Sequence, residues 1–183
     1  NLLFYPMFEP ETIEETDERL KYRDVDGAVR IYLKEDATIP SGWKWPIEDR
    51  KSWEKLKDER INFNNIRERL PGNWDQLVEE YKSRDYPLAL GGYPQGYFCT
   101  LAHLMGYKKL FLSYYDDPDL VHDILNTFTE LWIAVYSEVL KDVDIDHYHF
   151  WEDMSFGSGS MVSKKIIREF MVPYYQRMTD FLK

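Results

Sequence analysis

Two adjacent carboxylates, Glu152 and Asp153, directly follow an aromatic and apolar run from Val143 to Trp151. Carboxylates in this position are costly to bury unless a substrate, a metal or a hydrogen-bond donor compensates them. At the carboxyl end of a buried strand they would lie where α/β enzymes place their chemistry. We therefore predict catalytic roles for Glu152 and Asp153. The alternative for Asp153 is that it caps the following loop through backbone amides.

His147 and His149 are two residues apart within the same run, so on a strand they project from one face. Two histidines with this spacing can share a metal ion, with Glu152 or Asp153 as an oxygen ligand. The sequence offers no recognisable third strong ligand. The alternative is that both histidines line a pocket or bond to neighbouring groups. We therefore predict that His147 and His149 contact a substrate, and we assign no metal ligand.

Tyrosines gather around the glycine-rich segment 91–96 and near the run that ends at Trp151: Tyr93, Tyr97, Tyr148, Tyr174 and Tyr175. A tyrosine whose ring packs and whose hydroxyl reaches a pocket can position or protonate a substrate. We select Tyr93 and Tyr97 as substrate-binding residues. The glycine spacing fits neither a P-loop nor a dinucleotide fingerprint, so the glycines indicate a close approach of backbone to a ligand or a neighbouring loop.

The elements that would position these residues alternate between strands and helices. Apolar runs predict strands at 86–91 and 143–151, and a helix between them opens with Asp117-Pro118 and ends near Lys141. Ser163 is a good N-cap for the last helical segment. Asp26-Gly27 predicts a β-hairpin over 19–34. Further elements are predicted as an irregular loop pinned by Trp43 and Trp45 at 35–49 and helices at 50–60, 74–84 and from Tyr97 to Gly106.

Strands and helices in this order are typical of parallel βα units.

The composition of the chain excludes some classes of binding partner. The 183 residues carry a formal net charge of −10, which argues against nucleic acid, because phosphate binding needs clustered Lys and Arg. No run is long enough to span a membrane. Cys99 is the only cysteine, which fits a reducing cytoplasm, and we expect it to be a buried apolar side chain.

The order of several segments resembles the uroporphyrinogen decarboxylase superfamily, which includes corrinoid-dependent methyltransferases. The matching segments are 23–27, 88–96, 104–106 with 117–121, 146–154, and Ser163 with 170–173. The resemblance implies a (β/α)8 TIM-type barrel, so that residues 1–183 would be a single domain and a central fragment of a larger barrel. Such a fragment would expose sheet edges and apolar faces, which predicts poor solubility or homo-oligomers.

Within that superfamily the sequence Glu152-Asp153-Met154 is similar to the methyltransferase-like branch. The resemblance then implies methyl transfer between a small methylated substrate and a corrinoid protein. It also implies a zinc ion whose ligands lie mostly outside these residues, with Glu152 orienting the substrate and Tyr97 near a substrate-contacting position. One alternative is cofactor-free decarboxylation of a tetrapyrrole, although the arginine-rich segment that holds substrate carboxylates in true decarboxylases is not found here. The other is a non-catalytic binding domain.

Overall fold

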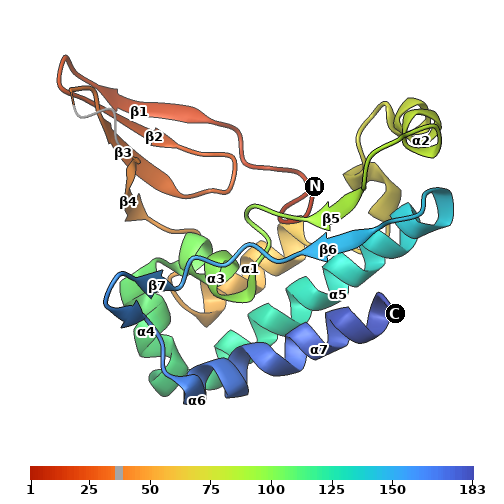
Figure 1. The fold of residues 1–183 in the computed structure, drawn as a ribbon. Helices are drawn as coiled ribbons and strands as arrows, with labels where there is room; N and C mark the ends of the chain where they lie inside the picture. Colours follow the sequence, from red (N-terminus) through yellow and green to blue (C-terminus); the bar gives the residue numbers. More distant parts are fainter. Residues whose placement is uncertain (36–38) are drawn as a thin grey trace.

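An antiparallel sheet of four strands forms the N-terminal part of the computed structural model, which describes residues 1–35 and 39–183 (Figure 1). Its strands follow one another in sequence order: β1 (Glu11–Glu15), β2 (Arg19–Arg23), β3 (Val29–Leu33) and β4 (Ser41–Lys44). The predicted hairpin is confirmed as β2 and β3, with Arg23 opposite Val29. Gly27 in its turn has a φ of +83°, the left-handed conformation that favours glycine.

The predicted irregular loop at 35–49 is wrong in part, because β4 pairs with β3 in the second half of that stretch. Residues 36–38 lie outside the described residues. Trp43 is not buried, since 62% of its surface is exposed and the Lys21 ammonium lies 4.4 Å from its ring centroid. Trp45 is half-buried and lies so close to Gly106 that a Cβ there would come within 2.5 Å of its ring. Of the two tryptophans, only Trp45 therefore packs against the helices.

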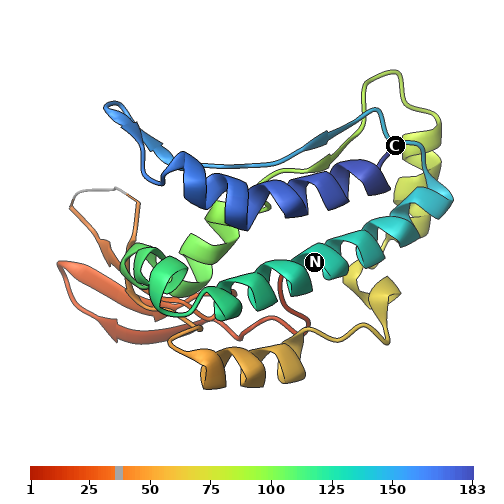
Figure 2. The ribbon, with the colours of Figure 1, turned by 90° about the horizontal axis from the view of Figure 1, so that it is seen from below.

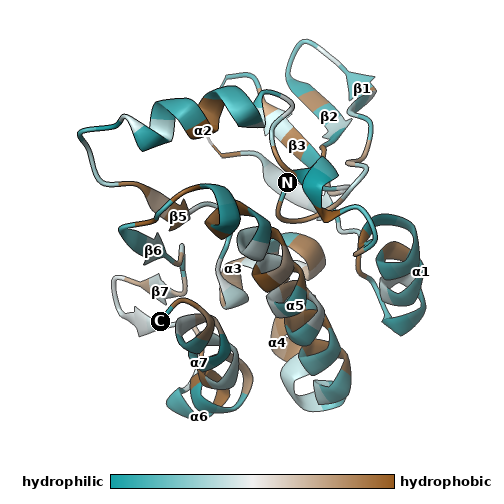
Figure 3. Cartoon of the chain, turned by 90° about the vertical axis from the view of Figure 1, so that its right-hand side faces the viewer, coloured by the Kyte–Doolittle hydropathy of each residue, from teal (hydrophilic) through white to brown (hydrophobic). Residues whose placement is uncertain are grey.

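Helices make up most of the remaining chain, and Figures 1 and 2 show α5 and α7 running side by side. Their bounds are α1 (Arg50–Arg60), α2 (Trp74–Lys82), α3 (Tyr97–Met105), α4 (Tyr107–Asp116), α5 (Pro118–Asp142), α6 (Lys164–Ile166) and α7 (Val172–Phe181). A 3₁₀ turn, η1, covers Ile66–Arg69, and a π-helical segment, η2, covers Ile167–Met171. Helix α5 carries many hydrophobic residues, whereas α1 is mostly hydrophilic (Figure 3).

Helix α5 is the centre of the hydrophobic core. The Asp117 side chain accepts a hydrogen bond from the Leu120 amide at 3.1 Å, which confirms the predicted cap. The predicted apolar stripe is buried along the 25 residues of the helix. Its buried aliphatic and aromatic members are Leu120, Val121, Ile124, Leu125, Phe128, Leu131, Trp132, Val135, Tyr136 and Val139. No helix among the described residues is long and apolar enough to cross a membrane.

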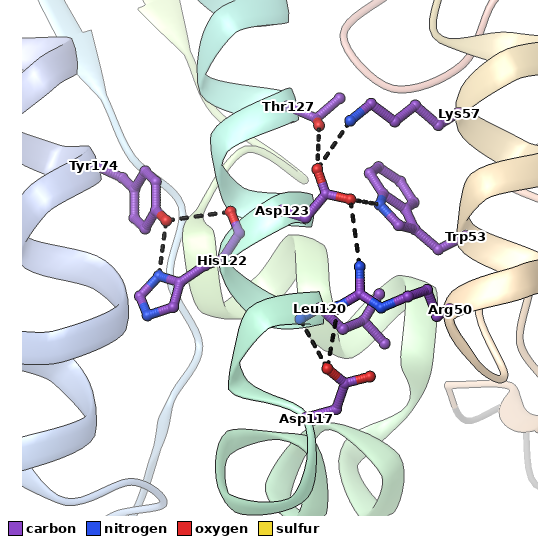
Figure 4. A network of polar contacts seen from close by, with 9 residues as sticks. All are labelled: Arg50, Trp53, Lys57, Asp117, Leu120, His122, Asp123, Thr127 and Tyr174. Atoms are coloured by element: carbon purple, nitrogen blue, oxygen red, sulfur yellow. Dashed lines mark hydrogen bonds and ion pairs between the residues drawn. The ribbon is translucent and has the colours of Figure 1, made fainter.

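Polar contacts attach α5 to α1 (Figure 4). The Asp123 carboxylate accepts hydrogen bonds from the Trp53 indole at 2.6 Å and from the Lys57 ammonium at 2.9 Å. On the other side of α5, the Tyr174 hydroxyl of α7 donates to the His122 carbonyl at 3.2 Å and lies 2.8 Å from the His122 imidazole Nδ1. Residues 122 and 123 therefore connect the helices on both sides of α5.

A parallel strand pair, β5 (Ala89–Gly91) and β6 (His147–His149), lies over these helices. Its register places Ala89 opposite His147 and Gly91 opposite His149. The predicted parallel connection is confirmed, although both strands are shorter than the apolar runs that predicted them. A further two-stranded antiparallel sheet consists of β7 (Ser155–Phe156) and β8 (Gly159–Ser160).

The predicted (β/α)8 barrel is wrong. In the part of the chain that the structure describes, β5 and β6 are the only parallel pair, the largest sheet is antiparallel, and no sheet closes on itself. The order strand, helix, strand correctly indicates one parallel unit, but it carries no information on how many strands join the sheet. The N-terminal strands pair with one another in antiparallel fashion instead of joining β5 and β6.

Candidate functional site

Glu152 lies just beyond the carboxyl end of β6, and its carboxylate caps helix α3. The Phe98 amide donates to Oε1 at 3.3 Å and the Cys99 amide donates to Oε2 at 3.1 Å. The first amides of a helix have no partner within the helix. The residue at the N-cap position, Gly96, has no side chain that could accept these bonds. The Glu152 side chain, from a distant part of the sequence, takes that role.

Close contact with Gly96 makes this arrangement possible. A Cβ atom at Gly96 would lie 2.0 Å from the Trp151 carbonyl oxygen and 2.6 Å from the Glu152 Cδ. The Trp151 amide in turn donates to the Gln95 carbonyl at 2.9 Å, so the two segments are attached to each other by backbone. The glycine-rich segment thus approaches a neighbouring loop closely, as the sequence indicated.

The Tyr175 hydroxyl, from α7, donates a hydrogen bond to Glu152 Oε1. Burial, together with the negative charge of Glu152, raises the pKa of Tyr175 well above its ordinary value. The phenol is therefore protonated at neutral pH and acts as a donor. Three elements meet at Glu152: the end of β6, the N-terminus of α3 and helix α7. The amides of α3 and the Tyr175 hydroxyl together hold the carboxylate in place.

Tyr97 lies in an aromatic cluster beside this group, and none of its surface is exposed. Its ring centroid is 4.9 Å from that of Tyr175 and 5.7 Å from that of Phe150. Its hydroxyl donates to the Tyr174 carbonyl at 2.9 Å and accepts from the Thr129 hydroxyl at 3.2 Å. Burial also raises the pKa of Tyr97. The Tyr97 hydroxyl is therefore used for hydrogen bonds inside the core, and the Tyr97 ring packs against the ring of Tyr175, the residue that bonds to Glu152.

Cys99 is buried, as its sequence context predicted, and it lies on the first turn of α3. Its Sγ accepts a hydrogen bond from the Asp153 amide at 2.9 Å. Burial raises the pKa of the Cys99 thiol to about 12, which leaves it protonated and unreactive at neutral pH. The Asp153 side chain itself is exposed. The two carboxylates predicted to be catalytic therefore differ, since Glu152 is held and Asp153 faces solvent.

The other residues selected from sequence lie at the surface. His147 and His149 are exposed on β6. Tyr93 is 66% exposed, with its ring centroid 4.9 Å from Trp151 and 5.4 Å from His103. None of the three is among the groups that bond to the Glu152 carboxylate in the described structure.

The resemblance implies a zinc ion whose ligands lie mostly outside these residues, and this stays a prediction. Among residues 1–35 and 39–183, no group of three or more His, Cys, Asp or Glu side chains is arranged to hold a metal ion. His147 and His149 with one carboxylate therefore do not form a three-ligand site, and Cys99 is occupied by the Asp153 amide.

Two residues of this region were not selected from the sequence. Tyr175 was grouped with its neighbouring tyrosines, and only its position on α7 reveals that it faces Glu152. Gln95 is 1% exposed and accepts a hydrogen bond from the Tyr136 hydroxyl through Oε1. The sequence signal for Gln95 was its position as the single long polar side chain within the glycine-rich segment, since a polar group in a buried turn needs an internal partner.

No family model matches the sequence, and no curated protein or solved structure is found to be similar to it. The resemblance to the uroporphyrinogen decarboxylase superfamily therefore rests on the order of its motifs alone. What that resemblance implies about activity stays a prediction.

Proposed function

We propose that this protein is an enzyme that transfers a methyl group between a small methylated substrate and a corrinoid protein, with Glu152 as its functional carboxylate. The motif order that resembles the methyltransferase-like branch supports the substrate class. The observation that carries the proposal is the position of Glu152 between the amides of α3 and the Tyr175 hydroxyl. It follows a parallel strand at its carboxyl end, where α/β proteins hold reactive groups.

The two oxygens of Glu152 have different surroundings. Oε1 accepts bonds from the Phe98 amide and the Tyr175 hydroxyl, and Oε2 accepts a bond from the Cys99 amide. A carboxylate oxygen can accept two hydrogen bonds. In the proposed site Oε2 is the oxygen that would accept a bond from an O–H or N–H group of a substrate.

In the proposed reaction the bond between the methyl carbon and the substrate oxygen or nitrogen breaks. The electron pair of that bond stays with the oxygen or nitrogen, which takes up a proton, and a reduced corrinoid on the partner protein would supply the electron pair for the new bond to the methyl carbon. Glu152 orients the substrate, and Tyr175 fixes the Glu152 side chain. Asp153, exposed beside Glu152, is the group that would exchange the proton with solvent.

The test follows the visible spectrum of reduced cobalamin under anaerobic conditions for conversion to methylcobalamin. Methanol, methylamines and aryl methyl ethers are supplied separately as donors. We expect conversion with one of these donors and a loss of about 100-fold in Glu152→Gln, the size of effect that a misplacement of about 1 Å in a substrate can have. Glu169→Gln is the matched control, because Glu169 is an exposed glutamate on η2 outside the site. Circular dichroism verifies that each variant is folded.

Absence of conversion with every donor would contradict the proposal. Decarboxylation of a tetrapyrrole and a non-catalytic binding domain would then be the remaining interpretations, and incubation with uroporphyrinogen separates them. Conversion that is unchanged in Glu152→Gln would preserve methyl transfer but remove Glu152 from it.

A further inference from the structure

A cavity of about 410 Å³ lies between the β2–β3 turn of the N-terminal sheet and the segment that leads into α3. This volume falls within the range of small-ligand sites, which begins at about 300 Å³. Its polar and aromatic lining comes from Tyr22, Asp24, Asp26, Arg30, Tyr93 and His103. The cavity involves neither the Glu152 carboxylate nor the residues that bond to it.

The charged groups of this cavity carry a net negative charge. The Arg30 guanidinium lies 2.8 Å from an Asp24 oxygen and also pairs with Asp26. Only 16% of the Arg30 side chain is exposed, and its bonds are directed at these two carboxylates. Two carboxylates against one guanidinium leave one uncompensated negative charge. The cavity therefore disfavours anionic ligands, because the net negative charge repels them and the Arg30 guanidinium is already paired.

Aromatic rings form another part of the cavity wall. Tyr93 is two-thirds exposed, so its ring surface is open to a ligand, and it packs edge-on against the His103 ring. Burial lowers the pKa of His103, which keeps the imidazole neutral at neutral pH and leaves the cavity charge unchanged. Its Nδ1 is buried without a hydrogen-bond partner among the described residues. A cation beside a tyrosine ring is attracted by the negative charge of the ring face.

We propose that this cavity binds a small organic cation of the alkylammonium class. The positive charge lies against Asp24 and Asp26, and the alkyl groups lie against the rings of Tyr22 and Tyr93. A hydrated metal ion fits less well, because each carboxylate already accepts bonds from Arg30 and from a backbone amide. The proposal does not depend on methyl transfer, since it concerns binding at a separate place in the fold.

Calorimetric titration of the whole protein with choline tests the proposal. The neutral isostere 3,3-dimethylbutan-1-ol, in which carbon replaces the charged nitrogen, has the same shape and measures the contribution of charge. We expect choline to bind at least about tenfold more tightly than the isostere. Tyr93→Leu should weaken choline binding by about fivefold, whereas Tyr93→Phe, which keeps the ring, should leave it unchanged. Tyr93 is exposed, so neither substitution should disturb folding.

Asp24→Asn provides an independent variant, because it removes the charge while retaining the size of the side chain. We expect about fivefold weaker choline binding in this variant and no change for the neutral isostere. Equal affinity for choline and the isostere, no choline binding at all, or binding that is insensitive to both Tyr93→Leu and Asp24→Asn would each overturn the proposal.

Discussion

Replacing Gly96 by alanine tests the close contact between α3 and the segment that carries Glu152. The added Cβ would lie 2.0 Å from the Trp151 carbonyl oxygen, whereas an ordinary carbon-to-oxygen contact is about 3.3 Å. The Trp151 carbonyl must therefore move by about 1.3 Å. Gly96 has an extended backbone with a φ of −157°, which alanine adopts readily, so the steric overlap alone drives the change.

The expected loss of stability has two parts. Overlap in a packed region destabilises by about 1–3 kcal/mol. Movement of Glu152 away from the amides of Phe98 and Cys99 removes a helix cap, which contributes about 0.5–2 kcal/mol. Together these lower the free energy of unfolding by about 2–5 kcal/mol. For a chain of this length the midpoint of thermal unfolding should fall by roughly 5–15 °C.

Urea and thermal unfolding, followed by far-ultraviolet circular dichroism, measure this loss. Gly72→Ala is the control, because a Cβ at Gly72 meets no heavy atom within 4 Å in the described structure and needs no unusual φ. Its stability should stay within about 1 kcal/mol of the parent protein. If Gly96→Ala unfolds at the same urea concentration as Gly72→Ala, the close contact and the capping role of Glu152 are both refuted.

Three further predictions concern buried groups. Because burial raises the pKa of Cys99 to about 12, the native thiol should react with a disulfide reagent far more slowly than the urea-unfolded chain, and stability should fall as pH rises above about 8.5. Equal rates would contradict its burial. Although burial acts in the opposite direction, the hydrogen bond from Lys57 helps to lower the pKa of Asp123, so Asp123→Asn should cost about 1 kcal/mol at neutral pH. This difference should begin to shrink as pH falls below about 4, the ordinary pKa of an aspartate, and should vanish once pH is below the lowered pKa of Asp123; thermal unfolding across this pH range measures it. Tyr136→Phe leaves the buried Gln95 Oε1 without its hydroxyl donor, and urea unfolding should show a loss of about 1–3 kcal/mol; a neutral effect would show that this bond is not needed.

Helix positions could be predicted from the sequence because their signals are local. Asp117 and Ser163 were predicted as caps, and each accepts a bond from an amide three residues later. The apolar stripe of α5 likewise needs only the spacing of its own side chains. The β2–β3 hairpin follows from a two-residue turn signal.

The partners of Glu152 could not be predicted, because they are distant in sequence. The strand end could be located, but the α3 amides that the carboxylate caps and the Tyr175 hydroxyl depend on how helices pack. The barrel prediction failed for a related reason. An apolar run at 143–151 indicates an extended segment, yet pairing with a neighbour is required for a strand, and only His147–His149 finds one among the described residues.

The cap of α3 also sets an order of events during synthesis. The Cys99 amide precedes the carboxylate that satisfies it by 53 residues. A helix that carries its own cap can be completed as soon as its residues leave the ribosome, but α3 must wait until Glu152 has been made. Closing a loop of this length has an entropic cost that grows only slowly with length. The N-terminus of α3 is therefore expected to mature late, together with β6, and to be the end of the helix that opens first.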